Sequence, residues 1–277
     1  MPRIGTVLLS SLCIVQMLLS GMAEADSLAP IAQDWRFDIG VFFLNTDTTV
    51  RVDGTGGATG SDIDLKHDFA FGNQHRIRLD GYWRFFERHK LRFMYFDSRS
   101  DADRTISRDI QFGEVSFPAN AFVHASVNAQ ILELAYEYSF LRSDSFELAG
   151  SFGLHNLRIS TELSAVVSSV LGGGGVNLSS TADGNGPLPV IGLRFIWALN
   201  DQFYFDGQAQ FFAVKIDTYD GSLQDYKVDF VWQPFKNFGM GVGYNDFASR
   251  LNVSTAPFNG KLKFGYGGPL AFVTVAF

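Results

Sequence analysis

Charged side chains recur at every second position along several stretches of the chain. A period of two places alternate side chains on opposite faces of a β-strand, so the charged residues of each stretch share one face. Thirteen residues follow this pattern: Arg36, Asp38, Arg76, Arg78, Asp80, Arg84, Arg92, Glu133, Glu137, Glu147, Arg194, Asp206 and Asp229. Facing one another, they could form a network of ion pairs, or they could line a narrow polar channel.

A second group of residues could support nucleophilic catalysis. Ser151 and His155 lie on the same face of one predicted strand, and Glu133 lies on the neighbouring strand. Together they would make a Ser–His–Glu set. Residues four apart on a strand are about 13 Å apart, which is beyond hydrogen-bond reach. The spacing therefore argues against such a catalytic site.

Histidine is the third residue type with possible chemistry. If the strands close into a barrel, as the turn and loop lengths below predict, His75, His124 and His155 could approach one another near its outer rim and bind a metal ion. Isolated histidines in such places are more often ordinary interior polar residues. We therefore expect no metal site and no cofactor.

The charged positions belong to strands whose other face is apolar. In 74–98, Ile77, Leu79 and Trp83 alternate with the arginines, and aromatic residues gather beside a short polar break. An apolar face that ends in aromatics, opposite a charged face, is typical of a strand that crosses an outer membrane.

The same alternation recurs along the chain and predicts about ten strands. Short turns fall near His89, Ser143, Asp201 and Lys236. Longer connections are predicted at 50–73, 100–120, 160–186 and 249–260, and only the tip at 217–221 breaks this asymmetry. Short turns at one end and long loops at the other predict an all-β fold, a transmembrane antiparallel up-and-down β-barrel; eight or twelve strands remain possible.

One strand departs from regular alternation. Its apolar residues switch face between Leu132–Phe140 and the earlier set Val123, Ala125 and Val127. A β-bulge at 128–130 would explain the switch, and so would a part of the strand that rises above the bilayer.

Composition excludes several other classes of protein. The chain has 277 residues, a net charge of −7 and 28 phenylalanines, yet its mean hydropathy is only +0.06. A helical membrane protein needs apolar runs of about 20 residues, and the one long apolar run here is N-terminal. No basic stripe appears, so we expect no nucleic-acid partner.

The N-terminus resembles a secretory signal peptide. Arg3 precedes a mostly apolar run, and 23–25 has the Ala-x-Ala form, which predicts cleavage before Asp26. We therefore divide the chain into a signal peptide (1–25) and a barrel domain (26–277). The single cysteine, Cys13, falls in the signal peptide, so disulfides and thiolate chemistry are not expected in the mature chain.

The last seven residues carry a resemblance to a known group of proteins. Phe277 ends the chain, and Val275, Val273 and Ala271 precede it at every second position. This pattern resembles the C-terminal signal that the barrel-assembly machinery recognises, and the mature chain resembles the small Gram-negative outer-membrane barrels of the OmpA-like and OmpW-like type. The resemblance implies the outer membrane as location, with its lipids and lipopolysaccharide as surroundings. It transfers no catalytic or binding residue.

Three functions remain open at this point. The first is a structural or surface-interaction role, with the lumen plugged by charges. The second is a narrow pore for small solutes or ions, although mixed charge signs disfavour strong selectivity. The third is a lipid- or peptide-hydrolysing enzyme. Ten-stranded outer-membrane proteases use aspartate pairs and an Asp–His pair, and no Asp-x-His sequence occurs here.

Overall fold

The computed structural model describes residues 30–168, 175–216, 219–255 and 258–277. The predicted signal peptide and its cleavage site lie outside the described residues. So do most of the four-glycine run at 172–175 and part of the predicted tip at 217–221.

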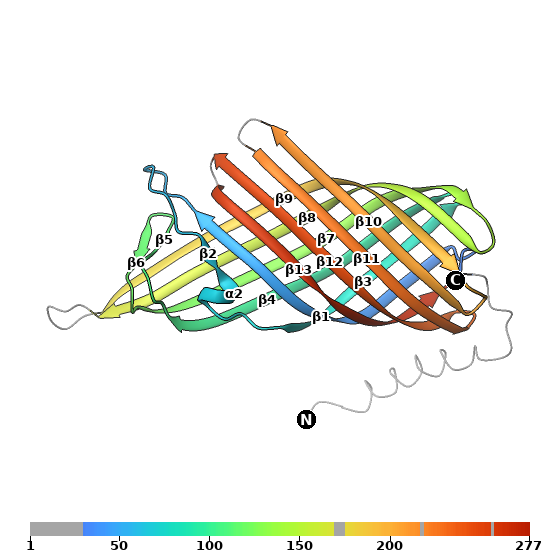
Figure 1. The fold of residues 1–277 in the computed structure, drawn as a ribbon, viewed down its shortest axis with the longest axis horizontal. Coiled ribbons are helices and arrows are strands. Elements are labelled where there is room, and N and C mark those ends of the chain that lie inside the picture. The colour runs from blue at the N-terminus through green and yellow to red at the C-terminus, as the bar shows by residue number, and fades with distance from the viewer. Residues whose placement is uncertain (1–29, 169–174, 217–218, 256–257) are drawn as a thin grey trace, which may run out of the picture.

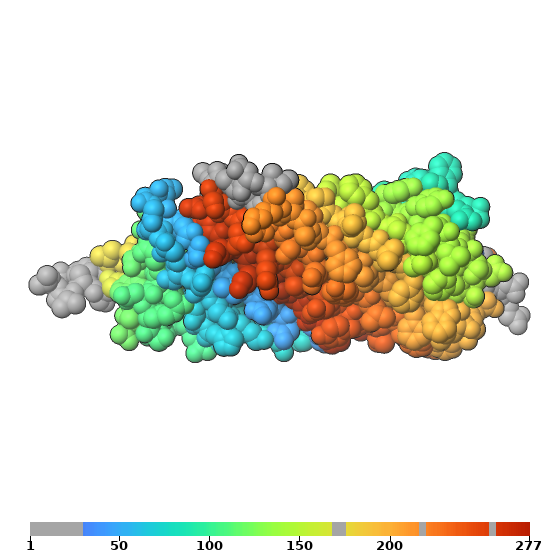
Figure 2. All heavy atoms as spheres, turned by 45° about the horizontal axis from the view of Figure 1, so that its top comes forward, coloured from blue at the N-terminus to red at the C-terminus, as the bar shows by residue number. Residues whose placement is uncertain are grey.

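Ten of the described strands form a closed antiparallel barrel. They are β1 (Trp35–Val52), β3 (Gln74–Phe86), β4 (His89–Thr105), β7 (Phe122–Arg142), β8 (Phe146–Ser168), β9 (Gly175–Ala198), β10 (Phe203–Ile216), β11 (Tyr219–Phe235), β12 (Phe238–Thr255) and β13 (Phe258–Ala276). The ring closes where β13 pairs with β1, from Arg36↔Ala276 to Val52↔Gly260. These first and last strands lie side by side in Figure 2. The ten-stranded up-and-down prediction is confirmed.

The end of the barrel opposite the short turns, which we call the far end, carries a cap. The cap contains β2 (Ile63–Asp64), α2 (Leu65–Asp68), β5 (Ile110–Phe112) and β6 (Val115–Phe117), which lie at the left of Figure 1. Its buried apolar side chains include Leu65, Phe112 and Phe117. In the connection predicted at 50–73, strand continues to Val52 in β1 and recurs in the two residues of β2, after which the segment turns into α2. Among the described residues, no helix is long and apolar enough to cross a bilayer.

Several strands are longer than their sequence indicates. The β8–β9 ladder continues to Ser168↔Gly175, and the β12–β13 ladder continues to Thr255↔Phe258. The long loops predicted at 160–186 and 249–260 are therefore mostly strand. Backbone hydrogen bonds to a neighbouring strand hold these Gly- and Ser-rich segments extended, although their composition is typical of a loop.

The two halves of the barrel have opposite polarity. On β7, apolar residues point outward from Leu132 to Phe140, while Glu133 and Glu137 point inward. Beyond Ile131 the order reverses. The outward side chains are His124, Ser126, Asn128 and Gln130, and the inward ones are Val123, Ala125, Val127 and Ala129.

This reversal does not come from a bulge. The pairings of β7 with β4 and β8 run without a register shift through 128–130, so the predicted bulge is wrong. The alternative explanation fits, because a strand that leaves the bilayer needs polar residues outside and an apolar core inside. The same change occurs on β12, where Tyr244 and Asp246 point outward on either side of the boundary. We call the outward apolar zone the belt.

Candidate functional site

Inside the belt, the lumen is filled by charged side chains that are at most 10% exposed. We call these the plug. Its described members are Arg36, Asp38, Arg78, Asp80, Arg84, Lys90, Arg92, Glu133, Glu137, Glu147, Arg194, Asp206, Asp225, Lys227 and Asp229. With seven basic and eight acidic groups, plus His155 among them, the described part of the plug is close to neutral. These side chains point into the lumen because every second residue of a strand faces the inside of the barrel.

Glu137 is the centre of the first group of ion pairs. Its carboxylate accepts a hydrogen bond from Arg92 Nε at 2.9 Å and another from Arg194 at 3.3 Å, and Lys90 Nζ lies 3.4 Å away. These residues come from β4, β7 and β9, which are not all adjacent. Glu137 is fully buried, so its charge is compensated by three cations instead of by water.

Arg84 and Glu147 form the second group. The guanidinium donates two hydrogen bonds to the two carboxylate oxygens, at 2.8 and 3.1 Å. Arg84 also donates to the backbone carbonyl oxygens of Glu87 and Ile31, and Lys90 Nζ lies 3.2 Å from Glu147. A two-pronged contact of this kind fixes orientation as well as charge. It ties the lead-in segment before β1 to the short-turn end of the barrel.

Asp206 connects distant strands in the third group. Arg36 from β1 donates to its carboxylate at 2.9 Å, and Arg194 Nε from β9 donates at 2.8 Å. Arg36 also donates to Asp38, so one guanidinium joins two carboxylates.

The fourth group lies nearer the middle of the barrel. Arg78 donates to Asp80 at 2.7 Å, and Lys227 from the opposite wall lies 3.1 Å from Asp80 and 3.0 Å from Asp229. The contact between Lys227 of β11 and Asp80 of β3 crosses the lumen, whereas the Arg78–Asp80 and Lys227–Asp229 pairs each lie along one strand.

Tyr82 packs among the cations. Its side chain is 1% exposed, and Lys90 Nζ and the guanidinium carbon of Arg194 each lie 5.2 Å from the ring centroid. Cations at this distance over an aromatic face are attracted to it. The hydroxyl has no hydrogen-bond partner among the described residues, so the ring itself is the interacting group.

Little space is left in the middle of the plug. A cavity of about 10 Å³ lies between Tyr82, Arg92, Arg194, Asp206 and neighbouring side chains. That volume holds about one water molecule. The plug is therefore a packed ionic core, and not a hydrated channel at this level.

The structure places twelve of the thirteen charged residues singled out above in the plug. Arg76 lies beyond it and donates to Gln74 Oε1 at 2.9 Å and to the carbonyl oxygen of Arg99. Sequence reasoning missed Lys90, Asp225 and Lys227. Lys90 stands two residues from Arg92, and Lys227 and Asp225 stand two and four residues from Asp229, so strict alternation along each strand would have included all three. Lys90 directly follows the polar break 86–89, which obscured its place on the strand.

His155 lies at the boundary between the plug and the apolar core. Its Nε2 is 3.3 Å from Glu133 Oε2 and 2.9 Å from Gln210 Oε1. Among the described hydrogen bonds, none joins Ser151 to His155, so the geometry does not assemble the Ser–His–Glu set. Glu133, His155 and Asp225 offer atoms within 4.8 Å of one another and could hold a metal ion. Arg92 already contacts Glu133, so part of that negative charge is compensated without a metal.

His75, His124 and His155 do not form a cluster at the rim. His75 packs its ring against Phe43 on the outer surface, and His124 pairs with Asp103 at 2.8 Å, also on the outside. His155 is inside the barrel and fully buried. Strand alternation separates them, because His75 and His124 point outward while His155 points inward.

No protein-family model matches the sequence, and no curated protein matches it. Among solved structures, the outer membrane protease OmpT from Escherichia coli matches with a TM-score of 0.58 and 14% identity, over 92% of this chain and 99% of that one. Two other solved structures are less similar and support no inference. The toluene transporter TodX from P. putida matches with a TM-score of 0.35 and 9% identity, over 91% of this chain and 92% of that one. The outer membrane protein OprG from Pseudomonas aeruginosa matches with a TM-score of 0.32 and 11% identity, over 91% of this chain and 99% of that one. The likeness to OmpT shows that the chain has the fold of an outer-membrane β-barrel.

Proposed function

We propose that this protein is an integral outer-membrane barrel whose lumen is closed by the plug, with a structural or surface-interaction role and no pore. The observation that carries the proposal is the packing of the plug: near-neutral, buried, cross-linked between opposite walls and with space for about one water. A conducting pore with these charged residues would need a hydrated lumen, in which each Arg and Asp side chain contacts water instead of an oppositely charged partner. Ion conduction by the purified protein tests this closure.

The outer surface supports a membrane location. All four tryptophans of the chain, Trp35, Trp83, Trp197 and Trp232, point outward near the short-turn end and are 37–50% exposed. Trp35 stacks on Trp83 with ring centroids 5.1 Å apart. Amphipathic rings at one level are typical of a membrane–water interface, with the apolar belt directly beside them. We propose that outer-membrane lipids and lipopolysaccharide surround the belt.

The C-terminal residue is proposed to direct assembly. Phe277 is exposed, and its carbonyl oxygen accepts hydrogen bonds from the backbone nitrogens of Asp34 and Trp35, at 2.8 and 3.0 Å. Deleting Phe277 should remove both the terminal aromatic, which the assembly machinery would read, and these closing bonds. We expect less folded barrel in the outer-membrane fraction and more degradation, measured by fractionation and by heat-dependent migration on gels.

Phe277→Tyr is the matched control, because it keeps an aromatic terminus and all backbone bonds and should assemble normally. Equal barrel yield from the deletion and from wild type would contradict the proposed assembly role. Recovery of the wild-type chain as a soluble protein would contradict the membrane location itself.

A further inference from the structure

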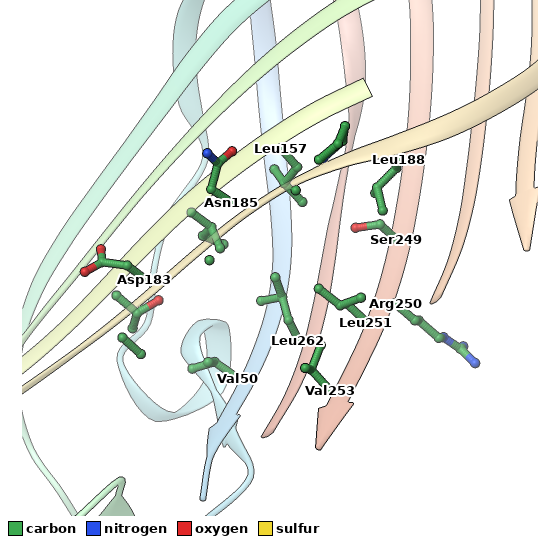
Figure 3. A pocket seen from close by; sticks show the side chains of 16 residues that line it. Val50, Leu157, Asp183, Asn185, Leu188, Ser249, Arg250, Leu251, Val253 and Leu262 are labelled. Atoms are coloured by element: carbon green, nitrogen blue, oxygen red, sulfur yellow. The ribbon is translucent and has the colours of Figure 1, made fainter. Parts of the chain in front are cut away.

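A cavity of about 340 Å³ lies in the far half of the barrel, beyond the plug. Its wall is mainly aliphatic and includes Val50, Leu157, Ile159, Leu188, Leu251 and Leu262. These side chains come from β1, β8, β9, β12 and β13. Those labelled in Figure 3, Val50, Leu157, Leu188, Leu251 and Leu262, surround one space. This volume and lining are within the range of small-molecule sites.

The barrel wall is open beside this cavity. β9 pairs with β10 only from Tyr204↔Ala198 to Phe211↔Ile191. Beyond that point β9 continues on β8 as far as Gly175, and β10 continues on β11 as far as Ile216. Figure 1 shows the ends of β8 and β9 at the left and those of β10 and β11 at the top. Among the described residues, β9 has no ladder partner on this side over 175–190.

The sequence of β9 suits an open edge. Pro187 and Pro189 lie in the part of β9 that has left β10. Proline has no backbone N–H and is confined within sheets mainly to edges, so it is compatible with a wall that does not close here. The two prolines are therefore consistent with an unpaired edge of β9 at this place.

The opening lies where the belt ends. A hollow of about 390 Å³ at the branch point is lined by Phe152, Pro189, Ile191, Phe211 and neighbouring residues. Phe152, Ile191 and Phe211 are exposed members of the belt. The cap covers the far end, where Phe112 of the cap accepts a hydrogen bond from Ser180 of β9. The side opening therefore faces the edge of the hydrocarbon layer.

The lining of the cavity favours an uncharged ligand. Arg250 extends away from Leu251 and Leu262 in Figure 3, and Asp183 lies at the edge. Inside, Ser249 donates its hydroxyl to the carbonyl oxygen of Phe264 at 3.1 Å, so its donor is already used. A charged group placed against the aliphatic part of the wall would lose its hydration without gaining a partner there.

We propose that this cavity binds a hydrocarbon chain that enters sideways from the membrane between β9 and β10. The chain is either the acyl chain of a bilayer lipid or a free apolar molecule dissolved in the membrane, since both present the same aliphatic surface. The inference depends on the proposed membrane location. It does not depend on closure of the lumen, because none of the described plug residues lines this cavity.

Gly186 offers a way to fill the cavity without disturbing its wall. It lines the cavity from β9, and a Cβ built on it meets no atom within 4 Å. Gly186→Leu should therefore occupy the space that the ligand needs. Gly150→Leu on β8 is the matched control. The nearest atom to a Cβ at Gly150 is a ring carbon of Phe140 at 3.9 Å, and the alternation along β8 points this position outward, toward lipid.

The test uses the full mature chain in lipid nanodiscs and two photoreactive probes. One probe is a phospholipid with a diazirine at the end of an acyl chain, and the other is an alkyl diazirine without a head group. After illumination, mass spectrometry locates the labelled residues. Val231, which is buried in the plug half, gives the background for an inward residue that no probe should reach.

We expect label on Leu188, Leu251 or Ile159 in wild type and in Gly150→Leu, and a fall to the Val231 background in Gly186→Leu. If the phospholipid probe labels these residues, the ligand of the cavity is the acyl chain of a bilayer lipid. If only the alkyl probe labels them, the ligand is a free apolar molecule dissolved in the membrane. Two outcomes would overturn the proposal: label confined to belt residues in wild type, or undiminished cavity label in a folded Gly186→Leu barrel. Loss of membrane insertion by wild type would instead overturn the proposed location.

Discussion

Replacing Arg84 by alanine should lower the free energy of unfolding by about 3–5 kcal/mol, the usual cost of leaving a buried charge without its partner. Glu147 would lose both of its hydrogen bonds from the guanidinium and would retain Lys90 at 3.2 Å as its remaining cation. The backbone carbonyl oxygens of Ile31 and Glu87 would also lose a donor. Urea unfolding of the refolded barrel in lipid vesicles measures the difference.

Arg158→Ala provides the control for the Arg84 measurement. Arg158 is exposed on the outer face of β8 beyond the belt, so its loss should change stability by no more than about 0.5 kcal/mol. If Arg84→Ala unfolds at the wild-type urea concentration, Glu147 is solvated when its partner is absent. That result would mean a hydrated lumen and would contradict the plug.

Tyr82→Ala should be destabilising by a similar amount, about 3–5 kcal/mol, as is typical when a buried aromatic ring is removed. The ring fills the space between Lys90 and Arg194, and each cation loses an aromatic face on which it packs. The remaining cavity would lie next to the existing space of about 10 Å³. The same unfolding assay measures this effect.

Tyr82→Phe separates the ring from its hydroxyl. Since the hydroxyl has no hydrogen-bond partner among the described residues, its removal should cost less than about 0.5 kcal/mol. Equal losses from Tyr82→Phe and Tyr82→Ala would show that the hydroxyl is the important group. That outcome would contradict the packing of the plug around an aromatic ring.

The belt half of the barrel was predictable from sequence because two signals coincide there. Outward residues such as Leu134 are apolar and inward residues such as Glu133 are charged, so the period of two is visible. Arg76 shows where the reasoning fails. It continues the alternation of Arg78 and Asp80. The period of two predicts which face of the strand a residue lies on, but not how far along the barrel axis it lies. Arg76 lies beyond the plug, where it contacts Gln74 and Arg99 and forms an ion pair with none of the described acidic side chains.

The far half could not be predicted in the same way. Its strands leave the bilayer, so their outward residues are polar, as at Asn128 and Arg158. Inward residues such as Ala182 and Gly184 are small, so the composition of 160–186 is typical of a loop. What makes it a strand is the ladder to β8, an interaction between distant residues that no local pattern encodes.

The open side of the barrel arises because the ladder between β9 and β10 ends at Phe211↔Ile191. Pro187 and Pro189 are consistent with an edge strand, but proline is equally common in turns. Only the pairing shows that β9 stays with β8 while β10 turns away beyond Phe211. The cavity follows from that divergence, together with inward residues on β9 that are too small to fill it.

Electrical recording across a planar lipid bilayer gives the most direct test of the closed lumen. The wild-type protein should be inserted in folded form, checked by heat-dependent migration of the same preparation. With the plug intact and space for about one water at its middle, we expect no steady current at moderate voltage in monovalent salt. Reproducible, stepwise currents that persist through the recording would contradict the plug and would favour a narrow, hydrated pore.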